Sequence, residues 1–166
     1  HALDLAAAEA RYKELARAVH PDKFVRADPQ ARRAAMQRTV QVNEAWRTLR
    51  DPWKRAEYLL SLRGIETGGE DGLVLRKADG SRERVPVDQG LLMEMLEKRE
   101  ALADARLADD TAAVSALEAE MRERLARALA EVAAGLDGDA PAEDVARTLV
   151  AARYFRRFLE DIEQHT

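Results

Sequence analysis

The sequence contains no cysteine among its 166 residues. Disulfide bonds, thiolate nucleophiles and thiolate-held metal clusters are therefore all excluded from this chain. The three histidines, His1, His20 and His165, lie far apart and lack the spacing of metal ligands. We therefore expect no metal site and no bound cofactor.

Glycine and proline are also scarce, with 8 and 5 residues, whereas Ala, Leu, Glu and Arg dominate. This composition favours an all-α fold. No apolar run approaches the roughly 18 residues of a membrane span, and no signal segment opens the chain. The formal net charge of −4 disfavours a nucleic-acid binder, which is usually basic. We therefore expect a soluble, intracellular protein whose partners are neither nucleic acid nor membrane.

Catalytic motifs are missing as well. The sequence has no glycine loop that could cradle a phosphate, no nucleophile elbow and no paired-histidine metal motif. Carboxylates are plentiful, but no pattern singles out a catalytic pair among them. We therefore expect that the protein is not an enzyme.

Helical signals fill the first 63 residues. Apolar residues recur at alternating three- and four-residue steps in the first helix, and Asp-Pro pairs at residues 28 and 51 begin the next two. The predicted helices cover residues 4–19, 28–50 and 51–62. A short loop makes the first two an antiparallel hairpin. Its predicted core consists of Leu15, Val19, Trp46 and Leu49.

Residues 64–86 differ in character from the helical segments on either side. The aperiodic stretch ETGGEDG is typical of a linker, and Asp79-Gly80 between two β-compatible runs indicates a small hairpin. Three longer helices follow, over about 87–108, 110–136 and 141–164, and their short loops predict a three-helix bundle. We therefore expect a domain over residues 1–63, a linker over 64–86 and a bundle over 87–166.

The first bundle helix carries more apolar surface than a three-helix bundle needs. One stripe consists of Leu91, Met95 and Leu102. A second stripe, displaced by more than a quarter turn, consists of Leu92, Met93 and Leu96, and Glu97 and Glu100 flank it. Together the stripes cover about half the circumference, whereas a core-facing stripe usually spans somewhat over 100°. Periodicity alone leaves two interpretations open, a broad core contact or a spare face for a partner.

The last helix shows a similar surplus. Its core stripe consists of Ala152, Phe155, Leu159 and Ile162. Tyr154 and Phe158 are predicted to point away from that stripe. Aromatic side chains outside a core often anchor a partner.

One short stretch, AVHPDKF at residues 18–24, interrupts the helical pattern. Proline disfavours a helical conformation for the residue before it, so the first helix ends at His20-Pro21-Asp22. An ordinary turn explains this tripeptide too, because Pro and Asp are common turn residues. The cations around this tip are Lys13, Arg17 and Lys23. An exposed aspartate among cations on a rigid tip is suited to exchange charge contacts with a partner.

The stretch from Leu5 to about Leu62 resembles the J domain of DnaJ-type co-chaperones. HPDK follows a helix, and VNEAWRTLRDPWKRAEYLL matches the later J-domain pattern. The matching positions are Val42, Asn43, Ala45, Trp46, Leu49, Arg55 and Tyr58. The resemblance implies that the tripeptide triggers ATP hydrolysis by a DnaK-type chaperone, on which the basic helix docks. The implied chaperone-binding residues are His20, Pro21, Asp22, Lys23, Lys13 and Arg17.

Three motifs, HPDKF, RAEYLLSL and LLMEMLEKREAL, narrow the resemblance to the HscB family of iron–sulfur cluster assembly, and it spans nearly the whole chain. It implies that the bundle carries an IscU-like cluster scaffold protein to an HscA-like, DnaK-class chaperone in the bacterial cytoplasm. The scaffold-binding positions of the family match Leu92, Met93, Leu96, Glu97, Glu100 and Tyr154.

The chain departs from the family pattern at two places. The family usually starts with a short aromatic-rich helix that is absent here, for which we expect truncation or disorder rather than evolutionary loss. The segment over residues 64–86 is longer than usual. Two alternatives therefore stay open, a J-domain co-chaperone with a different client and a helical adaptor whose tip is inert.

Overall fold

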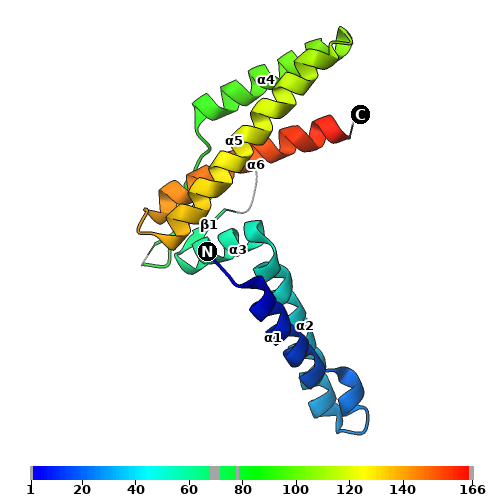
Figure 1. Ribbon diagram of the computed structural model, residues 1–166. Helices are drawn as coiled ribbons and strands as arrows, with labels where there is room; N and C mark the ends of the chain where they lie inside the picture. Colours follow the sequence, from blue (N-terminus) through cyan, green and yellow to red (C-terminus); the bar gives the residue numbers. More distant parts are fainter. Residues whose placement is uncertain (1, 68–71, 78, 165–166) are drawn as a thin grey trace. The chain divides into compact units, whose positions relative to one another are not determined.

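The computed structural model describes residues 2–67, 72–77 and 79–164, and its contacts divide the chain into two units, 1–58 and 59–166. The architecture is mainly helical, which confirms the predicted fold class. The elements (Figure 1) are α1 (Leu5–Ala18), the 3-10 turn η1 (Pro21–Phe24), α2 (Pro29–Arg50), α3 (Pro52–Leu62), β1 (Ile65–Glu66), β2 (Leu73–Arg76), β3 (Arg82–Val85), α4 (Gln89–Leu107), α5 (Thr111–Asp137) and α6 (Ala142–Glu163). None of the described helices is long and apolar enough to cross a membrane.

The helix boundaries follow their capping residues. Asp4 accepts a hydrogen bond from the Ala7 backbone N–H at 3.0 Å and thereby begins α1. Asp28 caps α2, where Pro29 occupies the first helical position and its missing N–H costs nothing. Every predicted helix end agrees with the structure to within about two residues, which is the usual uncertainty of helix assignment.

In the first unit, α1 and α2 pack against each other as the predicted hairpin (Figure 1). Tyr12 of α1 stacks on Trp46 of α2, with the ring centroids 5.2 Å apart. The Tyr12 hydroxyl also donates a hydrogen bond to Asn43 Oδ1 at 3.0 Å. One aromatic pair with a polar contact at its edge therefore holds the middle of the two helices together.

The predicted core of this hairpin is only partly closed. Val19, Trp46 and Leu49 are half-buried, and Leu15 is 38% exposed, so its assignment to the core was wrong. Each helix of a two-helix hairpin has a single long neighbour, and a side chain at the edge of that contact stays in water. The apolar stripe of α1 therefore has more surface than α2 can cover.

The described residues between 64 and 86 belong to the second unit and include the predicted small hairpin, whereas residues 68–71 of the predicted linker lie outside the described part of the chain. β2 and β3 pair antiparallel on either side of the expected Asp79-Gly80 turn, and β1 adds to the other edge of β2, giving the order β1-β2-β3. Ile65 and Leu73 are buried, and β1 and β2 contact α6. A hairpin alone is marginal in water, so the third strand and the helix beneath supply the burial that it needs.

The helix α6 buries more residues than α4 or α5. It packs along α5 and also contacts α4 and the strands. Phe158 is 0% exposed, so the prediction that it points away from the core was wrong. Because α6 has neighbours on several sides, the buried arc of this helix is wider than one stripe and includes Phe158. The other aromatic residue predicted to point away from the core, Tyr154, is half-buried.

Two arginines tie the start of the second unit to the bundle. The guanidinium of Arg153, which is buried, donates a hydrogen bond to the carbonyl of Thr67. Arg63, just after α3, donates to the Leu136 carbonyl near the end of α5 at 3.0 Å. Both acceptors are main-chain carbonyls that strand or helix bonding leaves available, so these contacts satisfy polar groups that burial would otherwise penalise.

Candidate functional site

The tripeptide His20-Pro21-Asp22 connects α1 to α2 through η1. His20 is the N-cap of η1, and its Nδ1 accepts a hydrogen bond from the Asp22 backbone N–H at 3.3 Å. The Asp22 carboxylate lies 3.5 Å from the same nitrogen. The His20 and Asp22 side chains are nevertheless 57% and 85% exposed. A local hydrogen bond therefore closes the turn, which presents both polar side chains to solvent.

Thr39 of α2 fastens the residue that precedes the tripeptide. Its hydroxyl lies 3.0 Å from the Val19 carbonyl oxygen and 2.9 Å from that of Ala35. The contact with Ala35 is the ordinary bond of a helical threonine to the carbonyl four residues earlier. The contact with Val19 crosses to α1, and no pattern in the sequence predicts it. Thr39 is thus a positioning residue of the tip that sequence reasoning missed.

The predicted cations of the tip, Lys13, Arg17 and Lys23, are all exposed. Lys13 pairs with Glu9 at 2.8 Å across one helical turn, and such solvated pairs contribute little to stability. A partner can therefore displace Glu9 at small cost. Arg17 and Lys23 form no ion pair with any residue in the described part of the chain. The tip presents net positive charge, which suits an acidic partner surface.

The second predicted stripe of α4 lies on the surface of the bundle. Leu92, Met93 and Leu96 are 41%, 58% and 51% exposed. Met95 and Leu102 of the first stripe are 4% and 1% exposed and face the core. The structure therefore favours the interpretation of this stripe as a spare face over that of a broad core contact.

The remaining predicted scaffold-binding residues differ in their surroundings. Glu97 and Glu100 are exposed, and within the described residues neither carboxylate has an ion-pair partner. Tyr154 is half-buried on α6, a helix that contacts α4. Leu92, Met93 and Leu96, with these two carboxylates, define the apolar face of α4. Exposed apolar side chains beside free negative charge suit a partner that offers apolar pockets and cations.

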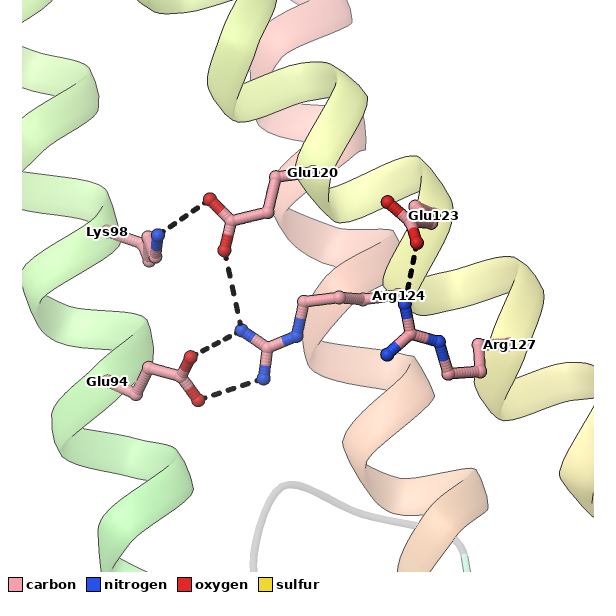
Figure 2. A network of polar contacts seen from close by, with 6 residues as sticks. All are labelled: Glu94, Lys98, Glu120, Glu123, Arg124 and Arg127. Atoms are coloured by element: carbon pink, nitrogen blue, oxygen red, sulfur yellow. Dashed lines mark hydrogen bonds and ion pairs between the residues drawn. The ribbon is translucent and has the colours of Figure 1, made fainter.

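A polar network connects α4 to α5 beside this face (Figure 2). Arg124 donates two hydrogen bonds to the carboxylate of Glu94, the longer of them 2.9 Å, and lies 3.8 Å from Glu120. Lys98 reaches the other oxygen of Glu120 at 2.6 Å. The hydrogen bonds from Arg124 hold the pKa of Glu94 below its usual value, and Glu94 in turn raises the pKa of Arg124. Both groups are therefore charged at neutral pH, as a bidentate pair requires.

Metal ligands do not gather in the described part of the chain. No group of three or more His, Asp or Glu side chains there could hold a metal ion. The arrangement instead consists of two exposed surfaces, the basic tip and the apolar face of α4, which lie in different units. Exposed surfaces of this kind suit contact with other macromolecules.

A His-Pro-Asp tip on a helical hairpin is the mark of the class of J-domain co-chaperones. The family model of the DnaJ domain matches residues 4–58, and that of the HSCB C-terminal oligomerisation domain matches residues 87–163. The structure is similar to chaperone HscB from Vibrio cholerae, with a TM-score of 0.74 and 28% identity over 99% of this chain and 89% of that chain. Human co-chaperone protein HscB gives the same TM-score and identity over 99% of this chain and 75% of its own.

Curated sequences agree with the structural comparison. The co-chaperone protein HscB homolog of Burkholderia multivorans is 41% identical over 139 residues, which is 84% of this chain and 73% of that relative. The HscB homolog of Shewanella baltica strain OS195 is 43% identical over 134 residues, 78% of this chain and 70% of that relative. The chain belongs to the HscB family of co-chaperones.

Proposed function

We propose that this protein binds an IscU-like iron–sulfur cluster scaffold protein, delivers it to an HscA-like chaperone of the DnaK class and stimulates the ATPase of that chaperone in the bacterial cytoplasm. One observation carries the proposal: the chain has two exposed surfaces of different chemistry, the basic tip in the first unit and the apolar face of α4 in the second. The J domain, over residues 1–63, acts on the chaperone. The bundle, over residues 87–166, holds the client.

The tip acts on the chaperone by binding one of its conformations more strongly than the others. A ligand shifts a conformational equilibrium only through such a difference in affinity. The turn at His20-Pro21-Asp22 is already held by its own hydrogen bonds and by Thr39, so docking orders few additional groups. Lys13 and Arg17 add long-range attraction. In this proposal the groups that hydrolyse ATP belong to the chaperone, and the tip only promotes their active arrangement.

The apolar face of α4 acts on the scaffold protein through burial. A fully buried leucine or methionine contributes about 1.5–3 kcal/mol relative to an exposed one, and these side chains start roughly half exposed. Glu97 and Glu100 would pair with cations at the rim of the contact, and Tyr154 would add an aromatic anchor. The chain has no cysteine, so in this proposal the ligands of the cluster come from the scaffold protein.

ATP turnover by the cognate HscA-like chaperone, measured with scaffold protein present, tests the proposal. The parent should stimulate turnover, and His20→Gln should abolish the stimulation, because the imidazole is lost while the helices on either side remain. Arg50→Gln is the matched control, since it removes an exposed side chain at the opposite end of α2. Full stimulation by His20→Gln would favour the alternative of an inert tip. Stimulation without scaffold binding would indicate a different client.

A further inference from the structure

The half of α4 that carries the apolar face has little apolar packing beneath it. Leu91, the inward residue of the first turn, is only half-buried and borders a cavity of ≈ 320 Å³. Val87, Val150 and Phe155 line the same cavity from the preceding strand connection and from α6. Full burial on α4 begins only at Met95. Apolar contacts therefore leave the first turns of α4 weakly held.

Charged contacts hold these turns instead. Glu94 and Lys98 lie four residues apart, on either side of Met95, and each reaches an oppositely charged residue of α5 (Figure 2). The side chain of Arg124 is only 25% exposed, and that of Lys98 is 27% exposed. Ion pairs that are shielded from water and bidentate are stronger than solvated ones. The Glu94–Arg124 contact is bidentate, whereas the Lys98–Glu120 contact one turn later is a single ion pair, and the two carboxylates are 41% and 40% exposed. Contacts at two successive turns restrain both the rotation of α4 and its distance from α5.

Arg124 is itself held in place from a third direction. Its guanidinium lies over the ring of Phe155 on α6, 4.4 Å from the centroid, in addition to its contacts with Glu94 and Glu120. The negative face of an aromatic ring attracts a cation, and the attraction is stronger where water is excluded. The donor end of the α4 contact is thus anchored on both helices of the α5–α6 pair, the most extensive helix packing in the bundle.

The network and the apolar face occupy the same two turns of α4. Glu94 follows Met93 directly and lies two residues from both Leu92 and Leu96. A rotation or shift of these turns would therefore move the three exposed side chains together. We propose that the ion network Glu94–Arg124–Glu120–Lys98 positions the apolar face of α4 for its scaffold partner, and that these four residues are positioning residues with no scaffold contact of their own. This inference depends on the proposed function of the face.

Glu94→Gln tests the inference, because it removes the charge and keeps the shape of the side chain. Its matched control is Glu123→Gln, which changes net charge equally but breaks a pair with Arg127 that lies within α5 and is exposed on both sides. Titration with the IscU-like scaffold protein should show roughly fivefold weaker binding for Glu94→Gln, within the range known for residues that act without touching a ligand. Binding by Glu123→Gln should stay within about twofold of the parent.

Hydrogen–deuterium exchange of the full chain without partner supplies a second measurement. In Glu94→Gln the amides of residues 91–98 should lose protection from exchange, while those of α5 and α6 keep it. Glu94→Asp retains a carboxylate, so both its exchange and its scaffold affinity should fall between those of the parent and of Glu94→Gln. Unchanged exchange and unchanged scaffold affinity in Glu94→Gln would overturn the inference. Loss of protection throughout the bundle would overturn it as well, because the network would then be a general stabiliser. A parent that binds no scaffold would refute the proposed function itself, whatever the exchange shows.

Discussion

The two units of the chain hold their functional surfaces in different ways. In the first unit the buried residues of the described structure are Ala35, Arg55 and Ala56. In the second unit α6 alone contributes ten buried residues between Val145 and Ile162. The tip therefore depends on local hydrogen bonds, whereas the α4 face depends on a bundle core and an ion network. A short exposed turn can keep its conformation with little packing behind it. The apolar face of a helix is positioned only if the whole helix is held against its neighbours.

The largest expected effect tests whether the two units are independent. Phe158→Ala should destabilise the bundle by about 3–5 kcal/mol, because it leaves a cavity at a completely buried site. Both tryptophans, Trp46 and Trp53, lie in the first unit, so tryptophan fluorescence follows that unit and far-UV circular dichroism follows all helices. In denaturant titrations the dichroism transition should move to lower concentration while the fluorescence transition stays.

Leu129→Ala is the control for that experiment, since it truncates a side chain of α5 that is 37% exposed. Leu129→Ala should lower the free energy of unfolding much less, by about 1 kcal/mol or below. If the fluorescence transition of Phe158→Ala moves together with the dichroism transition, the units unfold as one and the contrast between them fails.

A smaller effect separates client binding from stability. Leu92→Ala with Leu96→Ala should weaken scaffold binding about thirtyfold, if each truncated anchor costs about 1 kcal/mol. The thermal midpoint should hardly change, because both side chains are about half exposed. Stimulation of the chaperone ATPase without scaffold should equal that of the parent. Calorimetric titration, melting curves and ATP turnover check the three statements.

Leu107→Ala is the matched control on the same helix, since Leu107 is 85% exposed and lies outside the apolar face. It should bind scaffold like the parent. Normal scaffold binding by the double variant would place the client site elsewhere. A much lower melting temperature would mean that the second stripe of α4 contributes to the core.

The smallest effect concerns the charge of the tip. Lys13→Glu with Arg17→Glu should slow association with the chaperone about tenfold at low salt, because the long-range attraction is reversed. Added salt should reduce the difference in association rate between this double variant and the parent, since salt screens charges that are far apart in solvent. Stopped-flow or surface-binding kinetics at several ionic strengths measure it. Arg47→Glu with Arg50→Glu changes the net charge equally at the far end of α2 and should have little effect.

If both double variants slow association with the chaperone equally, the overall charge of the protein, and not the charge of the tip, governs docking. A rate that ignores both variants and the salt would instead indicate an apolar contact. Either result would mean that the charge of the tip does not distinguish its mode of binding from that of the apolar face of α4.

Features that depend on neighbours along the chain could be predicted well. Asp4, Asp28 and the Asp-Pro pairs mark helix starts because a side-chain oxygen satisfies free N–H groups one turn away. The width of the apolar arc on α4 was predicted from periodicity, but periodicity left open whether Leu92, Met93 and Leu96 face the core or the solvent, and the structure shows them exposed. Their roles, like that of the tip, stay predictions that the experiments above decide.

Features that depend on distant parts of the chain were missed. Phe158 was placed outside the core because periodicity describes one helix and does not count the neighbours around it. Residues 64–86 were predicted to be a linker with a small hairpin; the hairpin is present, but the third strand and the contacts with α6, which bury Ile65 and Leu73, were not predicted. The pair Glu94–Arg124 joins residues 30 positions apart in the sequence, and Thr39 reaches Val19 from 20 positions away. No local pattern carries such contacts.

The amino-acid sequence by itself determined the helices, their ends, the tripeptide at the tip and the wide apolar arc of α4, since each follows from propensity, capping or periodicity within a few turns. Only the tertiary structure decided how many sides of α6 are covered, where the strands pack and which charges hold α4 against α5. The physical reason is that burial and ion pairing depend on distances in space, and folding brings together side chains whose separation along the chain carries no record of their contact.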